Sequence, residues 1–326
     1  MKKYIKFCLF FSIAMLGFTN TQAQAVKKQK VILDFDIGDD FDDANALGLI
    51  LASPEFEVLG VVVGFGNTPK RAQVACRFLY EVGREDIPVV QGRQTDDEFT
   101  KKHFYTKQFY WGEGFDKVKP IKQSAPDFII EQLKKYPNEV TLVTIGPVTN
   151  LGDVMDKDPN ALKLAKRVVS MFGSFYTGYG NSPIPCAEWN VKADILASQK
   201  FMASNAKFEF VGLDVTTYVL LKEEIIKLMS YRNSPLTNSI LALMTLSNHE
   251  RSIKEPIIYD SVAIGLLLWP ELFNTRKTYV KVDDQGYTVM DESKDPNCII
   301  ATSIDVKGFH EKYTERMLTQ NLMRKY

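Results

Sequence analysis

The stretch VILDFDIGDDFDDANAL, residues 31–47, decides the fold and points to the site. Its first six residues are mostly apolar and end in acidic ones, as a buried strand does at its carboxyl end. Residues 42–51 then place apolar side chains on one face at helical spacing. A buried strand followed directly by an amphipathic helix is the opening of a βαβ unit, which predicts an α/β fold.

The same alternation continues along the chain. Further strands are predicted over residues 57–65, 87–92, 140–146, 167–173, 208–216, 279–282 and 298–305. Further helices are predicted over residues 71–82, 222–230, 235–249, 260–268 and 308–323. This order predicts a mostly parallel central sheet with helices on both faces, in one domain over residues 26–326. Ligands bind such sheets at the carboxyl ends of the strands. The segments that we expect to share this edge follow Asp36, Gly64, Ile145, Gly173 and Val215.

Charge and leader sequence indicate the kind of partner and the location. Forty basic and forty acidic residues leave no net charge, which argues against a nucleic-acid partner and favours a small molecule. Residues 1–25 combine three early lysines, an apolar stretch over 8–18 and an Ala-Gln-Ala ending. This pattern is typical of a secretory signal peptide, and the apolar run is too short to span a membrane. We expect export to the periplasm or the exterior, cleavage after Ala23 or Ala25, and no membrane attachment afterwards.

The strongest chemical signal is a cluster of six aspartates within ten residues: Asp34, Asp36, Asp39, Asp40, Asp42 and Asp43. One or two would serve as helix caps. Six carboxylates repel one another, which raises their pKa values or requires a cation. Calcium takes about 6–8 oxygen ligands, whereas magnesium keeps more water. A bound metal lowers the pKa of water and a free carboxylate can accept its proton, so the cluster predicts calcium-dependent hydrolysis.

A strand followed by an Asp-x-Asp sequence also opens the phosphatases of the haloacid dehalogenase type. Those proteins require Thr or Val two residues after the second aspartate, and Gly38 stands there in this chain. The pair Asp42-Asp43 would have no role in such an enzyme, so this alternative is disfavoured.

Five segments, taken in order, resemble the inosine–uridine preferring nucleoside hydrolase family. They are residues 34–47 (DxDxG…DD-A-x-A-L), VVVGFGN ending at Asn67, TIGPVTNL (144–151), Asn181 with CAEWN (186–190), and YDSVAIG (259–265). The loop after Gly38 is two residues longer than the family's usual form. The resemblance implies a Rossmann-like α/β fold, calcium-dependent cleavage of ribonucleosides into ribose and nucleobase, and a homodimer or homotetramer.

The resemblance also implies roles for individual residues. Asp36 matches the general base that activates water. The implied calcium ligands are Asp36, Asp43, Asp260 and the backbone carbonyl of Ile145, with Asp40 as an alternative supplied by the longer loop. The implied ribose-binding residues are Asp42, Asn67, Asn181, Glu188 and Asn190. Trp189 is expected to form a wall of the pocket.

Two departures leave the chemistry of the leaving base and the substrate open. The family's usual His before the late aspartate is Tyr259 here, which could donate a proton, donate a hydrogen bond or simply line the pocket. His249 is a second candidate acid, whereas His103 lies in a loop and His310 is expected to be structural. The loop 103–115 could stack a nucleobase through Phe109, Tyr110 or Trp111, and Phe175, Tyr176 and Tyr179 could help to close the site. A different ribosyl compound as substrate, or a catalytically silent sugar-binding protein, remain alternatives.

Overall fold

The computed structural model describes residues 27–96, 101, 107–248 and 252–325. The expected signal peptide therefore lies outside the described residues, and export remains a prediction. Within the described part of the chain, no helix is both long and apolar enough to cross a bilayer.

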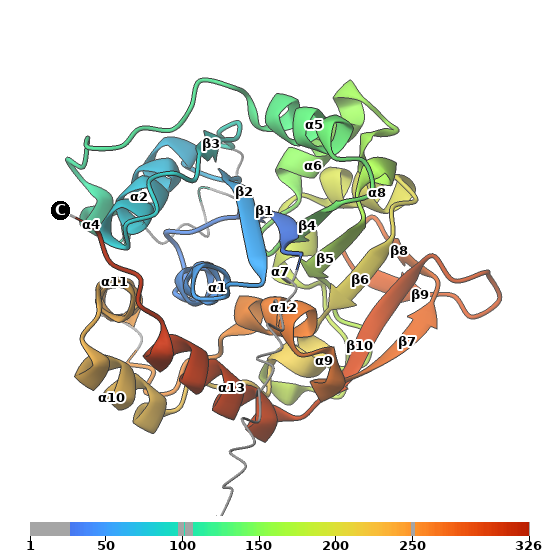
Figure 1. The fold of residues 1–326 in the computed structure, drawn as a ribbon. Coiled ribbons are helices and arrows are strands. Elements are labelled where there is room, and N and C mark those ends of the chain that lie inside the picture. The colour runs from blue at the N-terminus through green and yellow to red at the C-terminus, as the bar shows by residue number, and fades with distance from the viewer. Residues whose placement is uncertain (1–26, 97–100, 102–106, 249–251, 326) are drawn as a thin grey trace, which may run out of the picture.

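An eight-stranded sheet with the order β3-β2-β1-β4-β5-β6-β10-β7 forms the centre of the molecule (Figure 1). All neighbouring strands in it are parallel except β10 and β7. The strands are β1 Gln29–Phe35, β2 Phe56–Val63, β3 Val89–Gln91, β4 Val140–Thr144, β5 Arg167–Met171, β6 Phe208–Val211, β7 Phe273–Thr278 and β10 Cys298–Ile304. A separate antiparallel pair consists of β8 Val280–Val282 and β9 Thr288–Met290.

Helices cover both faces of this sheet (Figure 1). On one face lie α1 Asp42–Leu51, α2 Thr68–Glu81, α10 Glu223–Arg232, α11 Pro235–Asn248, α12 Tyr259–Leu268 and α13 Val306–Thr319. On the other lie α5 Ala125–Lys135, α6 Thr149–Lys157 and α8 Ile195–Ala203. Short helical segments are α4 Phe109–Gly112, α7 Trp189–Ala193, α9 Leu213–Thr216, η1 Ala161–Leu164, η2 Tyr179–Asn181 and η3 Pro270–Leu272.

The two layers are built by alternation along each strand. Val31, Leu33 and Phe35 of β1 pack into one apolar core and Ile32 into the other, because successive side chains of a strand point to opposite faces. Both clusters consist of buried hydrophobic residues, which explains why the strands appear in the sequence as continuous apolar runs. The predicted α/β fold with a mostly parallel sheet is confirmed.

One predicted strand is partly wrong, and two strands were missed. The strand predicted over residues 208–216 ends at Val211, and Leu213–Thr216 forms α9. Here Asp214 accepts hydrogen bonds from the backbone N–H groups of Phe175, Tyr176 and Thr177, and these contacts override the strand propensity of the segment. The missed strands are β7, which exposes its four middle residues, and β9, which has three residues.

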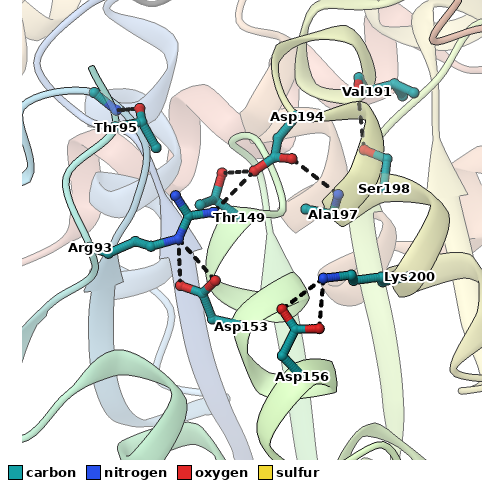
Figure 2. A network of polar contacts seen from close by, with 11 residues as sticks. Arg93, Thr95, Thr149, Asp153, Asp156, Val191, Asp194, Ala197, Ser198 and Lys200 are labelled. Atoms are coloured by element: carbon teal, nitrogen blue, oxygen red, sulfur yellow. Dashed lines mark hydrogen bonds and ion pairs between the residues drawn. The ribbon is translucent and has the colours of Figure 1, made fainter. Parts of the chain in front are cut away.

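A polar network fixes the segment that follows β3 to α6 and α8 (Figure 2). Arg93 pairs with Asp153 at 2.9 Å and with Asp194 at 3.5 Å. Asp194 accepts a hydrogen bond from the Thr149 hydroxyl at 2.9 Å and caps α8 through the backbone N–H of Ala197. Thr149 is the first residue of α6, so this network holds the helix that follows the loop after β4.

Candidate active site

A cavity of about 390 Å³ opens at the carboxyl ends of β1, β4 and β5. The residues that line it are Asp36, Asp39, Asp40, Asp42, Asp43, Ile145, Met171, Tyr179, Glu188, Trp189, Asn190, Tyr259 and Asp260. They come from segments that the sequence separates widely, and they meet at the sheet edge where α/β proteins bind their ligands. Residues that follow β1, β4 and β5 therefore do share an edge, as expected.

Three carboxylates converge in this cavity from the first turns of two helices. Asp42 and Asp43 begin α1, and Asp260 lies in the first turn of α12. A carboxylate oxygen of each lies within 4.8 Å of the other two, and the three residues are only 8%, 3% and 3% exposed. Hard oxygen donors at this spacing fit a hard divalent cation.

The electrostatics of this cluster favour a cation. Burial raises the pKa of Asp42, Asp43 and Asp260 well above the ordinary carboxyl value, and the charges of neighbouring aspartates raise it further. Such carboxylates either retain protons or are neutralised by a positive ion. The site therefore fits the metal that the acidic cluster predicts.

Asp36 directly follows β1 and lies beside this cluster. Its backbone N–H donates to the Asp43 carboxylate at 3.2 Å. A side chain at Gly146 would approach the Asp36 carboxylate to 2.5 Å, so the loop after β4 packs directly against it. Burial raises the pKa of Asp36, and the positive charge of Arg71 opposes this rise.

Arg71 is a buried cation that sequence reasoning missed. It lies on α2 with no exposed side-chain surface, and its guanidinium is 3.6 Å from the Asp36 carboxylate. It also donates to the carbonyls of Phe65 at 2.7 Å and Ile37 at 3.2 Å. The available signal was its position within the apolar stripe of an otherwise amphipathic helix, since a buried arginine requires partners.

The longer acidic loop is held in place by contacts from two other elements. Gly38 has φ +117°, and a Cβ there would lie 2.5 Å from the ring of Phe109, so glycine is required at this turn. The Gln108 side chain donates to the Asp40 carbonyl at 2.8 Å, and the Ser247 hydroxyl approaches the Asp40 carboxylate at 3.4 Å. Asp40 lines the cavity but lies outside the three-carboxylate cluster.

Glu188 and Asn190 line the cavity, and both also hold its wall together. The Glu188 carboxylate accepts backbone N–H groups of Gly173, Asn190 and Val191 at 3.0, 2.9 and 3.3 Å. Burial nevertheless raises the pKa of Glu188 to about 7. The Asn190 amide donates to the carbonyl of Ile145 at 3.2 Å and to that of Met171 at 3.0 Å.

Two of the expected ribose-binding residues are placed elsewhere. The Asn67 side chain accepts the backbone N–H of Lys70 at 3.2 Å and caps α2. Asn181 is exposed in η2, with φ +61°. Neither is among the residues that line the cavity. Both belong to segments that resemble family motifs, but here the Asn67 side chain caps a helix and Asn181 is exposed.

Three aromatic residues, Tyr179, Trp189 and Tyr259, line the cavity and make up its aromatic wall. The rings of Tyr179 and Tyr259 meet edge to face, with centroids 6.3 Å apart and an interplanar angle of 77°. The Tyr179 hydroxyl accepts the backbone N–H of Trp189 at 3.0 Å. Burial, followed by the charges of Asp42 and Asp40, raises the pKa of Tyr259, so its phenol keeps its proton near neutral pH.

The aromatic loop does not supply this wall in the described structure. Phe109 packs against Gly38, and Trp111 packs against Phe78 and the guanidinium of Arg77. Neither lines the cavity, nor does the exposed Tyr110. These contacts favour the structural role for the loop. His103 and His249 lie outside the described residues, and the ring of His310 meets that of Phe309 edge to face on α13.

A parallel α/β sheet with an acidic cavity at its carboxyl edge and buried aspartates on two helix N-termini defines the class of this protein. The model of the inosine-uridine preferring nucleoside hydrolases matches residues 31–311. The chain belongs to this family and is an N-glycosyl hydrolase.

Individual relatives agree with this assignment. The chain is 30% identical to the probable uridine nucleosidase 2 of Arabidopsis thaliana, over 80% of this chain and 84% of that protein. It is 29% identical to the pyrimidine-specific ribonucleoside hydrolase of Citrobacter koseri, over 88% and 97% of the two chains. Among solved structures, a plant nucleoside hydrolase shares the fold with a TM-score of 0.77 and 24% identity, over 90% of this chain and 100% of that one.

Proposed function

We propose that the chain hydrolyses the N-glycosidic bond of ribonucleosides in a calcium-dependent reaction, with a water activated by Asp36 as the nucleophile. The observation that carries this proposal is the convergence of Asp42, Asp43 and Asp260, within 4.8 Å of one another, on a cavity that Asp36 also lines. Membership of the family supports the bond that is broken. The donor set supports the metal.

The proposed calcium ligands are the carboxylates of Asp43 and Asp260, with the carbonyl of Ile145 and the carboxylate of Asp36 completing the protein part of the site. The geometry adds Asp42, whose carboxylate belongs to the same buried cluster. When bound, calcium would supply a fixed positive charge that binds ribose hydroxyls and lowers the pKa of water.

The chain's own residues perform the remaining steps. Asp36 accepts a proton from the attacking water, and Arg71 at 3.6 Å keeps its carboxylate oriented and favours its charged form. The amide nitrogen of Asn190 is engaged by two carbonyls, which leaves its Oδ1 atom to accept a ribose hydroxyl. As the glycosidic bond lengthens, the carboxylates around the cavity stabilise the oxocarbenium-like positive charge on the sugar.

Tyr259 and Trp189 are proposed to contact the departing base. The raised pKa of Tyr259 suits a hydrogen-bond donor better than an acid that transfers its proton. Tyr259 therefore orients the base, and Trp189 offers an aromatic face for it.

The decisive experiment measures ribose release by the purified mature chain from inosine, adenosine, uridine and cytidine. Calcium is first removed with a chelator and then restored, with magnesium added in a parallel reaction. We expect ribose from at least one nucleoside with calcium, and much less with magnesium or chelator. Ribose binding without any turnover would instead indicate a silent sugar-binding protein.

We also propose export, with residues 1–25 removed after Ala23 or Ala25, and assembly into a homodimer or homotetramer. Sequencing the N-terminus of protein recovered from the cell envelope or medium tests the first proposal. An intact Met1 start in that material would contradict it. Light scattering of the purified chain tests the second, and a monomer would contradict it.

A further inference from the structure

The cavity is lined by more acidic side chains than one divalent cation can neutralise. Seven of its lining residues are Asp or Glu, and the described lining residues include no Lys, Arg or His. A divalent cation offsets two charges, so a bound substrate meets a field that favours positive charge. Arg71 does not change this balance at the cavity surface, because its buried guanidinium reaches Asp36 from α2 and is not part of the lining.

Two of these carboxylates come from the longer loop after Gly38. Asp39 and Asp40 line the cavity in addition to the three clustered aspartates. Gln108 and Ser247 hold the backbone and side chain of Asp40, so its position is built into the fold. Asp40 and Tyr259 line the same cavity, so this carboxyl group and the aromatic wall both face a bound substrate.

The aromatic wall itself suits a flat cation. Tyr179, Trp189 and Tyr259 line the same cavity, and the first and last of these rings are in edge-to-face contact. The faces of such rings attract a positive charge, most strongly when water is excluded. A delocalised aromatic cation would be bound both by these faces and by the carboxylates behind them.

We propose that this cavity prefers ribosyl compounds whose base is a cationic aromatic ring, such as an N-ribosylpyridinium or a ring-alkylated purine nucleoside. This inference rests on the proposed ribohydrolase function and names its substrate class. The reason is the coincidence, in one cavity, of two additional carboxylates with three aromatic rings and no basic side chain among the described residues that line it.

The reaction of such a substrate balances without an acid. The water oxygen forms a bond to C1′ of the ribose, and the bond from C1′ to the ring nitrogen breaks. The electron pair of that bond returns to the nitrogen, so the ring that entered as a cation leaves as a neutral molecule. The proton lost by the water passes to Asp36 and then to solvent. No group has to protonate the base, and a tyrosine at position 259 is sufficient to orient it.

The test compares substrates and competitors on the calcium-loaded mature enzyme. The substrates are ribosylnicotinamide as the cation and uridine and inosine as neutral nucleosides. The competitors are 1-methylnicotinamide and nicotinamide, which differ by one methyl group and one positive charge and cannot be hydrolysed. We expect a higher kcat/KM for ribosylnicotinamide than for either neutral nucleoside. We also expect inhibition by 1-methylnicotinamide at a concentration about tenfold lower than by nicotinamide.

Variants separate the charge effect from the intrinsic reactivity of the pyridinium. Asp40→Asn and Asp39→Asn remove one charge each with little change in shape. Each substitution is expected to lower kcat/KM for ribosylnicotinamide. This loss should be several-fold larger than the loss of kcat/KM for the neutral nucleoside, uridine or inosine, that the enzyme hydrolyses. Asp295→Asn, at an exposed site, is the control and should change neither value.

The outcomes are distinct for the two proposals. Calcium-dependent hydrolysis of neutral nucleosides without preference for the cation, or equal losses on all substrates in Asp40→Asn, would overturn this inference and leave the proposed function standing. Absence of ribose release from every compound would overturn both. Equal inhibition by the two competitors would also refute the inference, independently of any variant.

Discussion

The guanidinium of Arg71 lies 3.6 Å from the carboxylate of Asp36, and their side chains are 0% and 11% exposed. This pair joins α2 to the end of the first strand, at the residue proposed to activate water. Arg71 also donates hydrogen bonds to the carbonyls of Ile37 and Phe65. The proposed base is therefore held by a cation that belongs to the protein itself.

Replacing Arg71 by Met is expected to lower the free energy of unfolding by about 3–5 kcal/mol, because it leaves a buried carboxylate without its partner. Arg71→Lys should lose less, since it retains the charge. Urea unfolding in the presence of a chelator measures the free energy of unfolding of both variants. Arg84→Met is the matched control, because it breaks an exposed pair with Asp86 and should cost about 0–1 kcal/mol. Equal losses for Arg71→Met and Arg84→Met would show that the buried pair does not support the fold.

Asp36→Asn is expected to reduce kcat by about 10²–10⁴-fold, the usual contribution of a positioned general base. Its calcium affinity should fall less than that of Asp43→Asn, because Asp36 lies outside the three-carboxylate cluster. Ribose release and calorimetric calcium titration on the same preparation separate the two effects. Ribose release at the wild-type rate would count directly against Asp36 as the base.

Asp43→Asn and Asp260→Asn are each expected to weaken calcium binding by more than about tenfold, since even outer partners of a metal site contribute 10–100-fold. Asp42→Asn should weaken it as well, because the structure places this carboxylate in the same buried cluster. Asp40→Asn should weaken calcium binding less than any of these three substitutions. A calorimetric titration in which Asp40→Asn loses the most affinity would instead assign the ligand role to the longer loop.

Calcium and protons should compete for this site. Burial raises the pKa of Asp34 and Glu188 to about 7, so the metal-free folded protein retains protons that the unfolded chain loses from about pH 4 upward. Its stability should therefore fall as pH rises from about 4 to 7. The raised pKa values of Asp42, Asp43 and Asp260 act in the same direction.

Calcium binding requires the carboxylates of Asp42, Asp43 and Asp260 to be ionised, so its stabilising effect should grow as pH rises. At a concentration of about 100 times Kd, the ligand contributes about 2.7 kcal/mol. Thermal unfolding with chelator and with calcium, at about pH 5 and about pH 8, measures the difference in Tm at each pH. A calcium-induced rise in Tm that is no larger at the higher pH would contradict this coupling.

The sequence by itself determined the layered fold, the acidic loop and the start of α1. Apolar runs such as residues 31–35 and the helical spacing over 42–51 are local signals, because they follow from the periods of a strand and a helix. The strands β7 and β9 gave no such signal, since β7 exposes four of its six residues and β9 has only three residues. The segment at Leu213–Thr216 looked like a strand by composition, and hydrogen bonds to Asp214 from a distant loop made it a helix.

Only the tertiary structure decided how the site residues are used. Motif order alone placed Asn67 and Asn181 with the ribose-binding set, but the structure directs the first to cap α2 and exposes the second. It also placed Arg71, which belongs to no motif, against Asp36. The physical reason is that secondary structure depends on neighbours along the chain, whereas the contacts of a buried charge depend on which elements the folded sheet brings together.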